Sequence, residues 1–161
     1  MPHELDAIDK RILTALQRDG RMQNIELAKE VGLSPSPCLR RVRLLEEAGV
    51  IERYTAIVNP AKIGFGMTVF ARIELQGQAE DQVEHFIQAV AKLTQVLDCY
   101  VMAGDCDFLL RIVAEDLSGV RRFSAEHLGR IKGVRSIKTD IPMEHVKSTA
   151  IPLSPDIRGR A

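Results

Sequence analysis

The chain has 161 residues, enough for one ordinary domain or two small ones with real hydrophobic cores. Its apolar content of 45% is typical of a globular protein, and no apolar run is long enough to cross a bilayer. We therefore expect a cytoplasmic protein without a membrane partner. The 22 basic and 22 acidic residues cancel, so any argument for nucleic-acid binding must come from local placement of charge.

The residues that commonly carry chemistry are scattered. Cys38, Cys99 and Cys106 match no zinc or redox spacing, and an odd number of cysteines is a poor disulfide framework. None of the four histidines has a cysteine or carboxylate at metal-ligand spacing. There is no glycine-rich phosphate loop, nucleophile elbow or HExxH motif. The sequence therefore predicts no metal, no cofactor and no enzyme activity.

Residues 1–50 are predicted to form three short helices. In the first, apolar residues recur at helical spacing after Asp6, a suitable N-cap, and Gly20 ends the helix. The second is predicted between Asn24, as its cap, and Gly32, as its stop. None of these helices would be stable alone, so we expect them to share a small core.

The third helix, LSPSPCLRRVRLLEEAGVI, has a marked start and a marked stop. Ser34 can cap it, Pro35 suits the first helical position, and Gly49 marks its end. Only three residues, 32–34, separate it from the second helix. Two short helices joined by a short turn that contains glycine describe a helix-turn-helix, whose second helix enters the DNA major groove.

Arg40, Arg41 and Arg43 crowd one and a half turns of the third helix. Arg40 and Arg43 share an exposed face, while Arg41 lies nearer the core edge. The positive end of the helix dipole adds to their field, and a planar guanidinium can grip guanine or phosphate in two places. The alternative is a solvated face whose arginines pair with Glu46 and Glu47. Together with the helix-turn-helix pattern, the arginines favour DNA binding.

Residues 51–66 are predicted to join two domains. The stretch 51–59 alternates well enough for a strand, and Pro60, Gly64 and Gly66 then break the pattern. We place the domain boundary in this segment.

Residues 67–146 show a different periodicity, with the element order βαββαβ. The expected elements are strand 67–75, helix 79–93, strands 95–104 and 107–115, helix 117–131 and strand 134–146. This order predicts a ferredoxin-like antiparallel sheet with two helices on one face, and hence an α+β chain. Residues 147–161 are expected to form a tail.

The two faces of this sheet should differ. The apolar face of the first strand, expected to meet the helices, consists of Met67, Val69, Ala71, Ile73 and Leu75. The other face includes Phe70, with Arg72 and Glu74 beside it. The strand at 95–104 is apolar on both faces, which favours contact with a second subunit over coverage by the chain's own tail.

The segments LDAIDKRILTALQRDGR and NIELAKEVGLSPSPCLRRVRLLEEAGVI, followed later by MAGDCDFLLRI, resemble the Lrp/AsnC family of leucine-responsive or "feast/famine" regulators. The resemblance implies a bacterial or archaeal transcription regulator associated with the nucleoid. Its helix-turn-helix would bind double-stranded DNA, and its C-terminal ferredoxin-like (RAM) domain would dimerise and sense an amino acid. It also implies assembly into dimers and further into tetramers or octamers, with the effector between dimers. Leucine or another aliphatic is the first expectation, with proline or an aromatic left open.

The resemblance also carries over individual residues. In the recognition-helix segment these are Ser34, Ser36, Arg40, Arg41 and Arg43. The family's Gly-Asp-x-Asp effector loop matches Gly104, Asp105 and Asp107, with Tyr100 and Met102 before it and Thr139 and Asp140 in the last strand.

The chemistry of this loop fits an amino acid. An aspartate can accept from the ligand's ammonium group, and turn N–H groups beside Gly104 can donate to its carboxylate. Met102 and Leu109 could form an apolar wall. The alternative is an ordinary hairpin turn, in which Gly-Asp is common.

Two functions of other classes stay open at this point. The chain could be an amino-acid-binding assembly protein whose helical domain binds protein rather than DNA. It could also be an enzyme on the ferredoxin-like domain, with Asp105, Asp107 and Asp140 as an acid cluster. No nucleophile or metal ligand accompanies these acids, so the regulator is favoured.

Overall fold

The structure is a computed structural model that describes residues 4–153, and the chain divides into two compact units. We call residues 4–57 with 147–153 the helical unit, and Val58–Val146 the sheet unit. The part of the predicted tail from 154 onward lies outside the described residues. In residues 4–153, no helix is long and apolar enough to cross a membrane.

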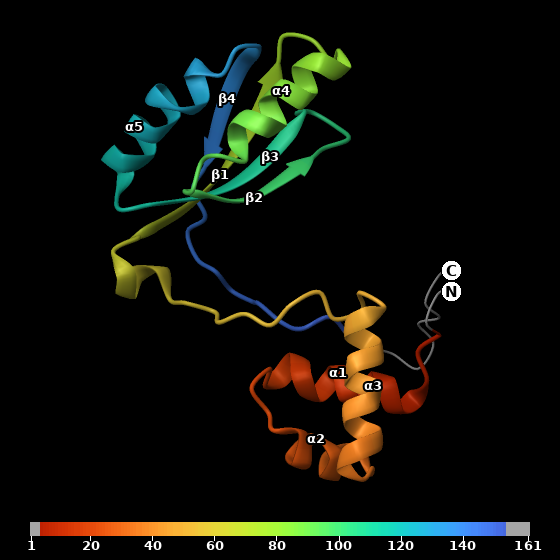
Figure 1. Cartoon of the computed structure of the whole chain (residues 1–161). Helices are drawn as coiled ribbons and strands as arrows, with labels where there is room; N and C mark the ends of the chain where they lie inside the picture. The colour runs from red at the N-terminus through yellow and green to blue at the C-terminus, as the bar shows by residue number, and fades with distance from the viewer. Residues whose placement is uncertain (1–3, 154–161) are drawn as a thin grey trace. The chain divides into compact units, whose positions relative to one another are not determined.

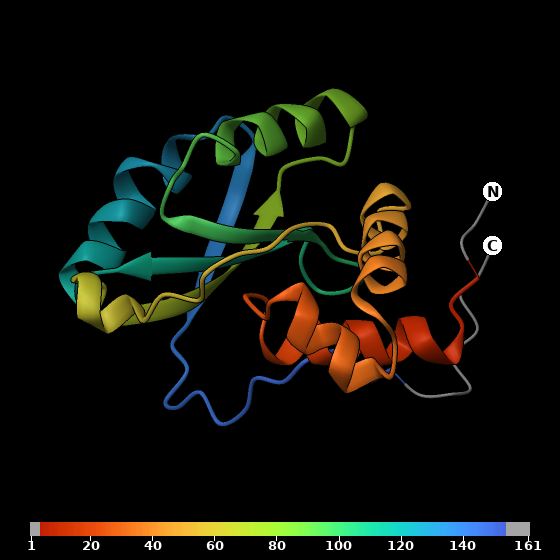
Figure 2. The same cartoon turned by 60° about the horizontal axis from the view of Figure 1, so that its bottom comes forward.

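The helical unit contains the three predicted helices, α1 (Ala7–Arg18), α2 (Asn24–Val31) and α3 (Pro35–Glu47) (Figure 2). They pack around one buried cluster: Ile12, Leu13, Ala15, Leu27, Ala28, Val31, Cys38 and Leu45. The predicted tail returns to this unit, where Leu153 packs against the cluster.

The helix ends of this unit follow local chemistry. Asp6 caps α1, with its carboxylate accepting from the backbone N–H groups of Ile8 and Asp9. Gly32 ends α2 in the left-handed conformation, at φ +75°, which glycine adopts without steric cost. Asn24 is not the cap predicted for α2, because it is already the first helical residue and Gln23 precedes it. Ser34 precedes α3 without a capping hydrogen bond from its side chain.

The sheet unit has the predicted βαββαβ order and confirms the α+β fold (Figure 1). Its elements are β1 (Met67–Leu75), α4 (Glu80–Val90), β2 (Val96–Val101), β3 (Phe108–Ala114), α5 (Leu117–Glu126) and β4 (Val134–Asp140). Short 3₁₀ turns precede β1 (η1, Pro60–Ile63) and follow α5 (η2, Leu128–Arg130). The four strands are antiparallel, in the order β2-β3-β1-β4.

Helices α4 and α5 cover one face of the sheet (Figure 1). Phe86 of α4 and Phe123 of α5 belong to the same core as the buried residues of β1 and β3. The ring centroids of Phe86 and Phe108 lie 4.5 Å apart. In β1 the buried residues are Val69, Ala71, Ile73 and Leu75, as the alternation predicted. Helix packing therefore leaves the face with Phe70 and Arg72 uncovered by α4 and α5.

Two of the predicted strands differ from the structure. Residues 51–59 form no strand, because a strand needs a hydrogen-bonded neighbour and none of the described segments pairs with them. The last strand ends at Asp140 instead of continuing to 146. Asp140 pairs with Phe70, close to the start of β1, and Pro142, which cannot donate a ladder hydrogen bond, follows soon after.

Candidate DNA-binding and effector-binding sites

The N-terminal end of α3 is held against α2. The side-chain amide of Asn24, at the start of α2, donates to the backbone oxygen of Pro35 over 2.9 Å. Ser34 and Ser36 are both exposed at this end of the helix. The exposed hydroxyl of Ser34 can donate to an external acceptor such as a phosphate oxygen.

Arg40 and Arg43 are exposed on α3, and neither forms an ion pair in residues 4–153. The arginine–glutamate pairs of the alternative interpretation are therefore not formed. Glu46 instead accepts a hydrogen bond from the hydroxyl of Tyr54, over 3.0 Å. Burial, with help from this carboxylate, raises the pKa of Tyr54 to about 12. The structure thus presents two cationic side chains on the surface of a helix-turn-helix.

Arg41 is placed differently from its two neighbours. Its Nη1 atom lies 2.8 Å from the carboxylates of both Asp6 and Asp9, at the start of α1. These two bonds raise the pKa of Arg41, the one to Asp9 contributing most. The structure therefore separates Arg41 from the exposed pair Arg40 and Arg43.

The Gly-Asp-x-Asp segment forms a closed loop between β2 and β3. The N–H of Met102 donates to the backbone oxygen of Asp107 over 2.9 Å. Within the loop, Gly104 has a φ of +148°, which residues with a side chain rarely adopt. Asp105 is exposed on the loop, and no described side chain forms an ion pair with it.

Asp107 has protein partners for both oxygens of its carboxylate. One oxygen accepts from the N–H of Leu75 over 2.7 Å, and the other accepts from the side-chain amide of Gln78 over 2.9 Å. Its own N–H donates to the backbone oxygen of Ile73 over 2.9 Å. Asp107 therefore ties the loop to the end of β1, which leaves Asp105 as the exposed acid of the motif.

The predicted effector residues fall into two groups within one chain. Tyr100 and Met102 are exposed beside the loop. Thr139 and Asp140 lie on β4, at the opposite edge of the sheet from β2. Three strand spacings separate the two edges, roughly 14 Å. Asp140 also forms an ion pair with Arg72, with 2.8 Å between Oδ2 and Nε.

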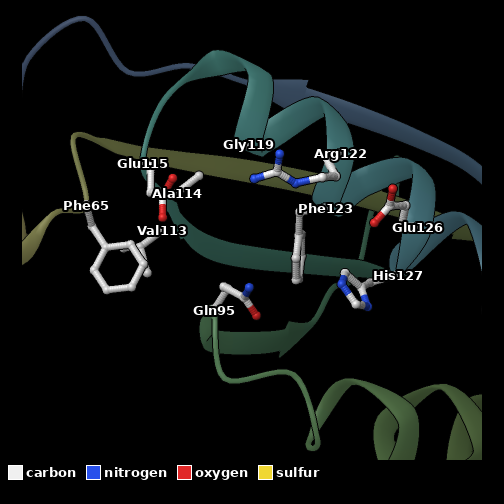
Figure 3. Close-up of a pocket in the computed structure, with 10 residues that line it drawn as sticks. All are labelled: Phe65, Gln95, Val113, Ala114, Glu115, Gly119, Arg122, Phe123, Glu126 and His127. Carbon is white, nitrogen blue, oxygen red and sulfur yellow. The ribbon is translucent and has the colours of Figure 1, made fainter.

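The part of the sheet unit that the structure describes contains at least two pockets. The pocket in Figure 3 is formed by α5, the end of β3 and the segment before β1, with Phe123 facing His127 at a centroid distance of 5.2 Å. Its volume of about 100 Å³ is below the roughly 300 Å³ at which small-molecule sites begin. The second pocket, of about 280 Å³, lies between α4 and β2 and is mostly apolar. It includes Val101 and Phe108, the residues at the two ends of the effector-loop region.

Sequence reasoning missed two anchors of these sites, Asp9 and Gln78. Asp9 lies three residues before Ile12 and four before Leu13, which places it on the apolar face of α1. A carboxylate on such a face needs a cation, and this signal could have identified Arg41 as its partner. Nothing in the sequence indicated Gln78. No group of histidine, cysteine, aspartate and glutamate residues between 4 and 153 could hold a metal ion.

Two family models match the chain. Residues 5–52 match a winged helix-turn-helix DNA-binding domain, and residues 68–152 match the Lrp/AsnC ligand-binding domain. The chain is 45% identical over 146 residues to the leucine-responsive regulatory proteins of Escherichia coli K12 and Klebsiella pneumoniae. These alignments cover 91% of this chain and 89% of each relative.

Solved structures of similar proteins share the whole fold. A transcriptional regulator from Neisseria meningitidis, in a complex with L-methionine, superposes with a TM-score of 0.88 at 36% identity. A regulator of the AsnC family from Agrobacterium tumefaciens superposes with a TM-score of 0.87 at 35% identity. Each comparison covers 92% of this chain and 97% of the other.

Proposed function

Because the chain belongs to the Lrp/AsnC family of transcriptional regulators, we propose that its DNA contacts come from the exposed N-terminal part of α3. The protein is a DNA-binding regulator with an amino-acid ligand-binding domain, and it is not an enzyme. The contacting residues in this proposal are Ser34, Ser36, Arg40 and Arg43. The observation that carries it is the exposure of Arg40 and Arg43, neither of which forms an ion pair with another residue between 4 and 153. Arginines so placed can reach phosphates and guanine edges.

The effector in this proposal is an aliphatic amino acid. Asp105 accepts from its ammonium group, and N–H groups of the loop around Gly104 donate to its carboxylate. Tyr100 and Met102 border the same loop. The N. meningitidis relative is described with L-methionine, which supports an aliphatic side chain. Leucine and methionine are therefore the first candidates.

The assembly in this proposal uses the face of the sheet that α4 and α5 do not cover. Phe70, Leu109 and Tyr100 all lie on this face. Leu109 pairs with Tyr100 of β2 and with Arg72 of β1, and Phe70 lies two residues before Arg72 on β1. A second copy that covers these apolar side chains forms a dimer with two recognition helices, matched to two half-sites. Dimers then associate into tetramers or octamers. Thr139 and Asp140 reach the effector only through such a neighbour.

The test combines DNA binding with particle mass. A fragment from the promoter upstream of the protein's own gene is titrated by fluorescence anisotropy, with and without each of the twenty L-amino acids. Native mass spectrometry of the same samples reports the assembly. We expect saturable binding and a shift in affinity or mass with leucine or methionine, because a ligand acts only through different affinities for two states. If the protein binds DNA specifically but no amino acid alters the affinity or the mass, the proposed effector binding is wrong. If the protein is a monomer, the proposed assembly is wrong. The protein resides in the cytoplasm, on the nucleoid, in this proposal.

A further inference from the structure

We infer that Arg41 is a positioning residue that sets the rotation of α3, rather than a third arginine that contacts DNA. This inference rests on the proposed contact between α3 and DNA. Its structural basis is the pair of ion pairs from Arg41 to Asp6 and Asp9, each at 2.8 Å.

The buried carboxylate of Asp9 stabilises the inward position of the Arg41 side chain. Asp9 is the one buried charged residue in the described part of the chain, with 2% of its surface exposed. A buried carboxylate is costly unless a cation and hydrogen bonds compensate its charge. If Arg41 turned outward to a phosphate, Asp9 would lose its guanidinium partner. The interaction with Asp9 therefore favours the inward position of Arg41.

Asp6 extends this arrangement to the first turn of α1. The side chain of Asp6 accepts from the N–H of Asp9, and the side chain of Asp9 accepts from the N–H of Asp6. Arg41 thus binds to a capping box whose two carboxylates are already fixed to the backbone. The two ion pairs of Arg41 therefore connect the middle of α3 to the start of α1.

The fixed position of Arg41 determines where its neighbours lie. Successive helix residues are about 100° apart around the axis, so Arg40 lies about 100° from Arg41 and Arg43 about 160° from it. When Arg41 faces α1, Arg43 lies on the side of α3 away from α1, and Arg40 lies at about a right angle to Arg41 on the same flank as Arg43. Arg40 and Arg43 are the exposed pair in the structure. Rotation of α3 would move both away from their contacts with DNA.

The salt dependence of DNA binding separates positioning from contact. In a plot of log affinity against log salt concentration, each phosphate contact contributes about 0.9 to the magnitude of the slope. Removing one contact therefore makes the slope shallower by about that amount. We therefore expect Arg40→Ala or Arg43→Ala to lower this slope wherever the arginine touches phosphate. Arg41→Met should weaken binding to the specific operator about tenfold or more while the slope stays at the wild-type value. Each variant is measured below its own unfolding temperature, which circular dichroism determines.

Asp9→Asn should change operator affinity in opposite directions under the two possible roles of Arg41. Because asparagine has nearly the same shape as aspartate, we expect this variant to fold. If Arg41 positions α3, Asp9→Asn weakens operator binding at an unchanged slope. If Arg41 contacts phosphate, the same change frees it, so binding tightens and the slope grows. Glu47→Gln, on the exposed part of α3, is the control for loss of one negative charge.

The inference is overturned if Arg41→Met lowers the slope as much as Arg40→Ala does, or if Asp9→Asn tightens binding beyond the Glu47→Gln control. Failure of the DNA proposal looks different. In that case Arg40→Ala and Arg43→Ala leave both affinity and slope unchanged, whatever the Arg41 variants do.

Discussion

The side-chain amide of Gln17 pairs with the backbone of Ile151 in the manner of a short β-bridge. Its Nε2 donates to the Ile151 oxygen over 3.2 Å, and the N–H of Ile151 donates back to its Oε1 over 2.9 Å. Two residues further on, Leu153 lies in a pocket that Leu5 and Thr14 also line. The C-terminal segment is therefore part of the helical unit, although the sequence predicted only a tail.

This contact predicts a stabilising role for the C-terminal segment. Leu153 is half-buried, so we expect Leu153→Ala to lower the free energy of unfolding of the helical unit by about 1–2 kcal/mol, below the range for buried leucines. Gln17→Ala should expose the amide of Ile151 to faster hydrogen exchange. Gln88→Ala is the control, since Gln88 donates to Glu84 on the exposed side of α4. An Ile151 amide that exchanges equally fast in the wild type and in Gln17→Ala would contradict the contact.

Asp6 predicts a pH dependence of stability. Burial raises the pKa of this carboxyl, but hydrogen bonds from Asp9 N–H, Arg41 and Ile8 N–H outweigh it and lower the pKa below 3.8. A group with a lowered pKa stabilises the fold fully above its unfolded pKa, and this contribution is lost as pH falls through the folded value.

We therefore expect the helical unit to lose stability as the pH falls below about 4, with a smaller loss in Asp6→Asn. Urea unfolding followed by circular dichroism between pH 7 and pH 3 measures this difference. Parallel profiles for the wild type and Asp6→Asn would show that Asp6 does not contribute.

The two acids of the effector loop predict two different phenotypes. Asp107→Ala removes the acceptor of the Leu75 N–H and of Gln78, so it should lower the free energy of unfolding of the sheet unit by about 1.5–3 kcal/mol. Asp105→Ala should change stability by less than about 0.5 kcal/mol, because Asp105 is exposed. It should nevertheless weaken binding of L-leucine or L-methionine about tenfold or more.

Thermal unfolding and isothermal titration calorimetry measure these two effects. If Asp107→Ala were as stable as the wild type, the anchoring role of its carboxylate would be wrong. Full amino-acid affinity in Asp105→Ala would instead exclude Asp105 as the ammonium acceptor.

Local signals in the sequence predicted most of the fold. The strict alternation of MTVFARIEL predicted β1 to the residue, because every second side chain enters the core. Pro35 in the first turn and Gly49 after the last turn bounded α3 for similar local reasons. The strand at 51–59 was wrongly predicted because alternation reports a tendency, whereas a strand also needs a neighbour that local sequence does not reveal.

The candidate sites were less predictable because they depend on distant partners. Helical spacing placed Arg41 nearer the core edge than Arg40 and Arg43, but local sequence did not identify its partners Asp6 and Asp9, which are 35 and 32 positions away. Asp105 and Asp107 likewise form one motif, yet the side chain of Gln78 and the N–H of Leu75 engage only the second. Residue type therefore identified the candidate arginines and aspartates, and tertiary contacts show which of them are anchored within the chain and which are exposed.

The central claim is that Arg40 and Arg43 on α3 contact DNA, and operator binding by the double variant Arg40→Ala/Arg43→Ala tests it most directly. Arg121→Ala/Arg122→Ala on α5 loses the same charge far along the chain and serves as the control. At 1–3 kcal/mol for each contact, the account predicts at least a roughly thirtyfold loss of affinity in the α3 variant. The control should bind like the wild type. Equal affinity of the folded α3 variant and the wild type for the operator would contradict the account.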